Sequence, residues 1–106
     1  MDMDSILKRA QEFQHLMSKK QEELAGRTIT STVGGGMVTV IVNGKFEIVS
    51  LQIDKAAINP DEAEMLQDLV IAAVNDAMRK TKEMTQSELA RLTGGLGLNI
   101  PGLFGG

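Results

Sequence analysis

The chain has 106 residues, enough for one domain, with 42% hydrophobic residues and a formal net charge of -3. It contains no cysteine, which excludes disulfides, thiolate catalysis and zinc–thiolate sites. The acidic N-terminus lacks the basic region of a signal peptide, and no apolar run approaches the roughly 20 residues needed to span a bilayer, so we expect a soluble cytoplasmic protein without a membrane partner.

The first predicted element is a helix from about residue 4 to residue 25. Asp4 or Ser5 can cap its start, and Gly26 occupies a position at which glycine commonly ends a helix. Its apolar residues recur at helical intervals of three, four or seven: Ile6, Ala10, Phe13, Met17 and Leu24.

From residue 27 to residue 54 the hydrophobic period changes to two, which predicts three strands. They cover residues 28–33, 37–42 and 45–53. Asn43-Gly44 predicts a tight hairpin between the second and third, because both residues tolerate the positive φ of a type I′ turn.

Two irregularities stand out in the predicted sheet. The third strand changes phase near Ile48 and Val49, which predicts a bulge. In the second strand, valines occupy one face while Met37 and Ile41 occupy the other. We therefore expect both faces of the sheet to be apolar and to need a cover.

The last predicted element is a long helix that begins at Asn59-Pro60, with Asn59 as cap, Pro60 in the first turn and Glu62 at the third position. Its apolar stripe runs to Gly94-Gly95, some 33 residues or roughly 50 Å. We expect residues 1–93 to form the folded domain. Residues 94–106, which contain 6 of the 11 glycines, are expected to form a flexible tail.

These elements predict an α+β fold in the order helix, three-stranded antiparallel sheet, long helix. Strands of six or seven residues extend roughly 20–23 Å, whereas the helices would extend roughly 33 and 50 Å. Both helices then overhang the sheet. Together with the apolar sheet faces and the short chain, this overhang favours a two-fold homodimer with projecting helical arms.

Candidate catalytic and metal-binding groups give little support to an enzyme. The one histidine, His15, has too few neighbouring ligands for a metal site or a triad. The glycines at 34–36 join two strands and lack the Lys-Ser/Thr of a phosphate loop. Acids at 61–68 suit a helix N-terminus. We expect no catalysis, no metal, no cofactor and no small-molecule substrate.

The basic residues are more informative. Most of them lie on the two predicted helices. In the second helix, residues 79–82 contain three bases and no acid, whereas residues 61–76 contain acids and no base. Such a distribution favours either a solvated face or a surface that contacts phosphates. The candidate DNA-binding residues are Lys8, Arg9, Lys19, Lys20, Arg79, Lys80, Lys82 and Arg91.

Several separate blocks resemble the YbaB/EbfC family of bacterial nucleoid-associated proteins. They are LKRAQEFQ at 7–14, GGGMVTV at 34–40, NG at 43–44, LQID at 51–54, EMLQDLVIAAVNDA at 64–77 and PGLF at 101–104. The resemblance implies a tweezer-like α-β-β-β-α homodimer. It also implies that the protein binds double-stranded DNA in the nucleoid, affects nucleoid organisation and gene expression, and has no catalytic activity.

Two other functions remain open at this point. The protein could be a protein–protein adaptor with incidental DNA affinity, using the acidic start of the second helix or the apolar tail, and the net negative charge favours this alternative. A hydrolase based on the acidic cluster is the weakest alternative.

Overall fold

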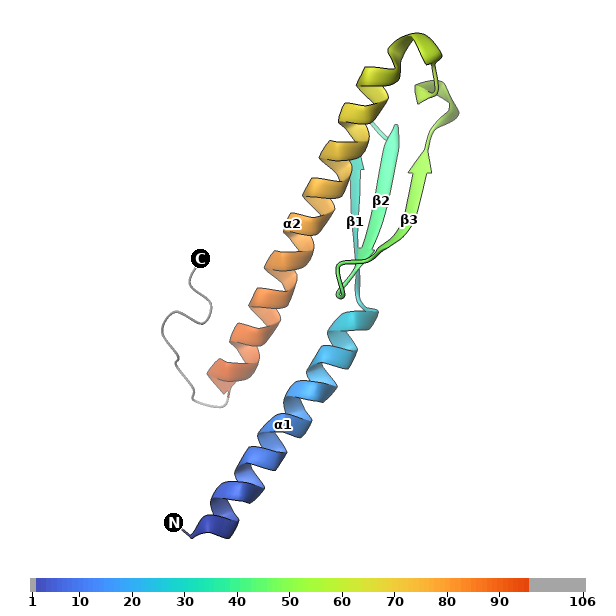
Figure 1. The fold of residues 1–106 in the computed structure, drawn as a ribbon. Helices are drawn as coiled ribbons and strands as arrows, with labels where there is room; N and C mark the ends of the chain where they lie inside the picture. The colour runs from blue at the N-terminus through green and yellow to red at the C-terminus, as the bar shows by residue number, and fades with distance from the viewer. Residues whose placement is uncertain (1, 96–106) are drawn as a thin grey trace.

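The computed structural model describes residues 2–95. The elements run in the order α1 (Met3–Gly26), β1 (Thr28–Val33), β2 (Val38–Asn43), β3 (Ile48–Ile53), two short 3₁₀ turns (Lys55–Ala57 and Pro60–Glu62) and α2 (Ala63–Gly95). Figure 1 shows α2 lying along the sheet while α1 extends away from it, so the molecule is long and narrow. The predicted α-β-β-β-α order is confirmed. Neither helix of the described chain is both long and apolar enough to cross a membrane.

The first helix begins at Met3, about one residue earlier than the sequence suggests. Asp2 is its N-cap, and the Asp2 carboxylate accepts a hydrogen bond of 2.8 Å from the backbone N–H of Ser5, which lowers the pKa of Asp2. At the other end Gly26 is the last helical residue. Arg27 leaves the helix in an extended conformation and donates its N–H to the carbonyl of Leu24 at 3.1 Å.

The three strands form an antiparallel sheet in the order β1-β2-β3. Between β2 and β3 the register shifts: Ile41 faces Ser50, but Val42 faces Ile48. Val49 is therefore an extra residue on β3, which confirms the bulge expected at Ile48 and Val49.

The connecting turns differ in how well the sequence predicted them. The turn at 34–36 consists of three glycines with positive φ, as expected for a strand-to-strand connection. The type I′ prediction at Asn43-Gly44 was wrong. The left-handed residue is Phe46, and the Asn43 side chain accepts from the N–H groups of Lys45 and Glu47 at 2.9 and 3.1 Å.

The hydrophobic core lies between β2 and the first half of α2. Val38, Val40 and Val42 are fully buried and form one cluster with Ala73 and Ala77 of the helix. Small alanines let the helix approach the sheet closely, and longer residues on either side complete the packing. These residues are Val33, Met37, Ile53, Leu66, Leu69, Val70, Val74 and Met78.

The second sheet face is not the apolar surface that the sequence predicts. Met37 precedes β2 and packs against the core, so it does not contribute to that face. The residues that alternate with the buried valines and their strand partners are mostly polar, Ile41 being the exception: Thr30, Thr32, Thr39, Ser50 and Gln52. Water can solvate this face without a partner.

The uncovered apolar surface lies instead along β3. Leu51 pairs with Val40, so both side chains point to the face that carries α2. However, α2 contacts mainly β1 and β2. Leu51 is consequently 47% exposed whereas Val40 is fully buried, and Ile48 and Val49 are exposed as well.

Candidate nucleic-acid interface

The eight basic residues predicted from the sequence lie on the two helices. Lys8, Arg9, Lys19 and Lys20 come from α1, and the others come from the C-terminal half of α2. All are exposed except Lys20, which is half-buried. Figure 1 shows that α1 and the C-terminal half of α2 project in the same direction from the sheet.

Two of the predicted bases, Arg79 and Lys80, form ion pairs with Asp76. The Asp76 carboxylate lies 2.6 Å from Nη2 of Arg79 and 2.9 Å from Nζ of Lys80. It also accepts a hydrogen bond of 2.8 Å from the hydroxyl of Ser31, a buried residue of β1. Hydrogen bonds from Lys80, Ser31 and Arg79 hold the pKa of Asp76 far below its ordinary value, and the pairing raises the pKa of Arg79.

Arg79 is further occupied by a second acid on the same helix. Its Nη1 lies 2.9 Å from a carboxylate oxygen of Glu83, one turn later. Arg79 and Lys80 therefore present much less free positive charge to a phosphate than the sequence suggests.

A second carboxylate, Glu88, gathers three cations. Its oxygens lie 3.0 Å from Nζ of Lys20, 3.0 Å from Nη1 of Arg27 and 3.5 Å from Nη1 of Arg91. Glu88 is only 8% exposed, and the hydrogen bonds from Lys20 and Arg27 lower its pKa. This cluster joins α1 and its C-cap residue to α2.

Sequence reasoning missed Arg27, Asp76, Glu88 and Ser31 as parts of these clusters. The spacings from Asp76 to Arg79 and Lys80, and from Glu88 to Arg91, are three or four residues, so the pairs within α2 could have been predicted. No sequence signal links Glu88 to Lys20 or Arg27, because those contacts depend on the tertiary fold.

Three of the predicted bases, Lys8, Lys19 and Lys82, form no ion pair within residues 2–95. Lys8 and Lys19 are eleven residues apart, so they lie within about 20° of each other around the helix axis. They lie on the side of α1 opposite to the stripe that contains Leu24, its buried residue. These lysines can meet an external anion without giving up an internal partner.

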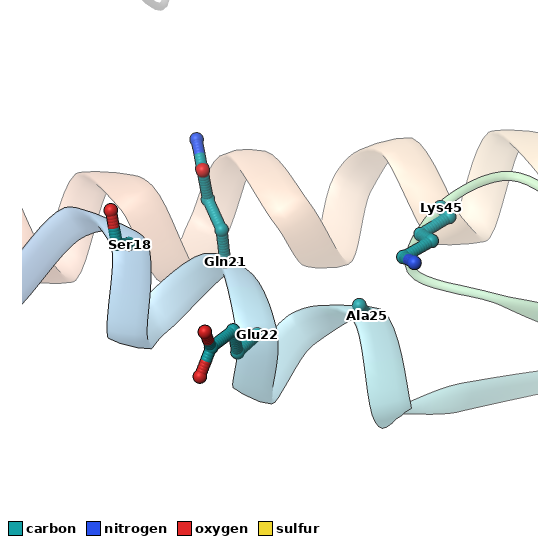
Figure 2. Close-up of a pocket in the computed structure, with 5 residues that line it drawn as sticks. All are labelled: Ser18, Gln21, Glu22, Ala25 and Lys45. Carbon is teal, nitrogen blue, oxygen red and sulfur yellow. The ribbon is translucent and has the colours of Figure 1, made fainter.

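A shallow groove of about 470 Å³ lies beside this surface, between the end of α1 and the β2–β3 loop. Figure 2 shows its lining: Ser18, Gln21, Glu22 and Ala25 from α1, with Lys45 from the loop. A second groove of about 330 Å³ next to it is lined partly by Leu24, Thr85 and Leu89. Within residues 2–95 no group of three or more histidine and acidic side chains is arranged to hold a metal ion.

Comparison with known proteins places these features in a family. Residues 1–96 match the model of the YbaB/EbfC DNA-binding family. A nucleoid-associated protein of Thermoanaerobacter sp. is 50% identical over 97% of this chain and 91% of its own length. One from Desulforamulus reducens is 52% identical over 97% and 96%.

The fold also has a solved relative. The crystal structure of an uncharacterized protein from Helicobacter pylori superposes with a TM-score of 0.76 at 28% identity, over 87% of this chain and 97% of that one. The similarity therefore extends over nearly all of the described fold, including both helices.

Proposed function

This chain belongs to the YbaB/EbfC DNA-binding family, and we propose that it binds double-stranded DNA as a homodimer in the bacterial nucleoid, affecting nucleoid organisation and gene expression. The structural observation that supports DNA binding most directly is the set of unpaired lysines, Lys8, Lys19 and Lys82, on the projecting helices. Relatives with about half their residues identical are named nucleoid-associated proteins.

Binding of this kind would hold the phosphate backbone more than it reads bases. Long flexible lysines make point contacts to phosphates, and these contacts fix position without reporting sequence. The chain has no Trp or Tyr, which disfavours stacking on single strands. We therefore propose moderate affinity, little discrimination between duplexes and a strong dependence on salt.

The proposed homodimer would bury the apolar surface that a single chain leaves exposed. On β3 the exposed residues are Ile48, Val49 and Leu51. On α1 they include Ile6 and Phe13, on the side opposite to Lys8 and Lys19. A second copy that covers both surfaces would leave those lysines facing outward on two pairs of arms.

The proposed role is binding without catalysis. His15, the one histidine, is exposed on α1, and no metal-holding group occurs within residues 2–95. Two acids of the described chain, Asp76 and Glu88, are occupied by cations of the same protein.

A gel-shift titration over several salt concentrations tests DNA binding. Three single variants are tested: Lys8→Gln, Lys19→Gln and Lys82→Gln. Each variant should weaken binding by the same factor for every duplex, whatever its sequence. Each should also reduce the salt slope by about one per phosphate contact, or about two per homodimer. Lys55→Gln removes the same charge from the 3₁₀ turn at the far end of the molecule and should change little.

The same experiment separates this function from the adaptor alternative. The adaptor gains support from the net charge of -3 and from the internal pairing of Lys20, Arg79, Lys80 and Arg91. If wild-type protein shows no salt-dependent binding to any duplex, the adaptor is the better proposal. Sedimentation should show twice the chain mass of 11.4 kDa at low micromolar concentration.

A further inference from the structure

Glu88 has an unusual place in the fold for a carboxylate. It lies in the part of α2 beyond the sheet, is 8% exposed, and contacts cations through both carboxylate oxygens. Oε2 lies 3.0 Å from Lys20 on α1, while Oε1 lies 3.0 Å from Arg27, the residue that caps α1. Arg91 lies 3.5 Å from the same Oε1.

The two partners contributed by α1 and its cap are seven residues apart. Seven residues make about two helical turns, so Lys20 and Arg27 lie on the same side of the helix, about 10 Å apart along its axis. Leu24, the buried residue of α1, lies between them. One carboxylate thus contacts two positions along the axis of α1, and contacts at two positions fix the direction of a helix.

The rest of α1 gives little other support for its direction. Residues 2–16 are all exposed, and α1 contacts the sheet mainly through β2. The orientation of the arm within one chain therefore depends on its last two turns, where Glu88 and Leu24 act together.

We propose that Glu88 is a positioning residue that fixes the direction of α1 relative to α2 and thereby places Lys8 and Lys19 for DNA. The placement of these two lysines for DNA rests on the proposed function. Lys8 lies about 18 Å from Lys20 along the helix, so a tilt of roughly 10° moves it by about 3 Å. A shift of that size is enough to break an ion pair with a phosphate.

The charge of Glu88 makes the inference sharply testable. Glu88→Ala makes each chain more positive by one unit and removes a partner of three cations, of which Lys20 keeps Glu23 at 3.6 Å. Electrostatics alone therefore predicts tighter DNA binding and a steeper salt slope. A positioning role predicts the opposite: weaker binding despite the added positive charge. Asp68→Asn makes the same charge change on the exposed start of α2 and is the matched control.

The direction of α1 can be measured without DNA. Because the chain has no cysteine, Gln11→Cys and Gln67→Cys place one spin label on α1 and one on α2. Doubly labelled chains mixed with excess unlabelled protein give the distance within one chain, whether or not it dimerises. We expect Glu88→Ala to broaden or shift that distance and Asp68→Asn to leave it unchanged.

Binding and distance are then compared in the same variants. We expect about fivefold weaker DNA binding for Glu88→Ala and a smaller loss for Glu88→Gln, which keeps the side-chain volume and one of the two accepting oxygens. Circular dichroism melts check that both variants are folded. If Glu88→Ala is not folded, the comparison is made with Glu88→Gln alone.

An unchanged label distance would overturn the positioning role. A changed distance with equal or tighter DNA binding would show that the direction of α1 does not matter for DNA, which also overturns the inference as stated. Wild-type protein that fails to bind DNA would refute the proposed function, while the label distance would still decide whether Glu88 positions α1.

Discussion

Asp76 connects the middle of α2 to the sheet and also forms ion pairs with two bases of its own helix. Its pKa lies well below its ordinary value of 3.8, because Lys80, Ser31 and Arg79 all donate hydrogen bonds to the charged form. A group whose pKa falls on folding stabilises the native state above its unfolded pKa. That stabilisation is lost as the pH falls toward the native pKa.

We therefore expect the melting temperature to be steady near neutral pH and to fall below about pH 4. The melting temperature of Asp76→Asn should be lower than that of wild type at neutral pH, and it should fall less on acidification. Circular dichroism melts over a pH series measure both effects, with Asp68→Asn as an exposed control. Parallel acid profiles for wild type and Asp76→Asn would show that Asp76 is not a source of the pH dependence.

The electrostatic contacts show how far sequence reasoning extends at this scale. Bases three or four residues after Asp76 must be its neighbours if the segment is helical, so those pairs are readable from spacing. The hydroxyl of Ser31 is 45 residues away and buried. Its contact exists because the antiparallel register places Ser31 beneath α2, which no local pattern specifies.

At the scale of the elements, the junction between α1 and the β2–β3 loop is tightly packed. Gly44 donates its N–H to the carbonyl of Arg27 at 3.0 Å, and a Cβ at Gly44 would collide with the backbone carbonyl of Leu24. The sequence signal at Asn43-Gly44 was thus real, but its reason is close approach to α1 and not positive φ.

Two glycine substitutions should accordingly have opposite effects. Gly44→Ala should lower the free energy of unfolding by about 1–3 kcal/mol, because backbone must move to admit the methyl group. Gly26→Ala has open space around it at the end of α1 and should raise stability by up to about 1 kcal/mol. Urea denaturation measures both, and destabilisation by Gly26→Ala would contradict this description of the junction.

The pair formed by Val40 and Leu51 separates folding from association. They are opposite each other in the sheet, but one is fully buried in a single chain and the other is 47% exposed. Val40→Asp buries an unpaired charge and should abolish folding. Leu51→Asp should keep the circular dichroism spectrum while shifting sedimentation toward the monomer. A Leu51→Asp protein that remains fully dimeric would exclude β3 from the interface.

At the scale of the whole molecule, the chain is far from compact. Its radius of gyration is 19.6 Å, whereas a compact domain of this length would have about 13 Å. The order of elements and the overhang of the helices could be predicted, because hydrophobic periods and strand lengths are local properties. The direction of α1 could not, since it depends on Glu88 and Leu24. The uncovered apolar surface was assigned to the wrong place, because strand alternation does not reveal which strands α2 covers.

Because residues 2–16 are exposed, the stability of the outer part of α1 depends on whether a second chain covers it. A helical segment of this length without tertiary contacts is only marginally stable in water, because nucleation is costly and little is gained by each added residue. In an isolated chain its amide protons should therefore exchange with solvent almost as fast as those of a free peptide. Protection of these amides in hydrogen-exchange measurements, and its loss in Leu51→Asp, would show that a second chain stabilises the helix. Fast exchange in a dimer of confirmed mass would mean that the arms fray in solution.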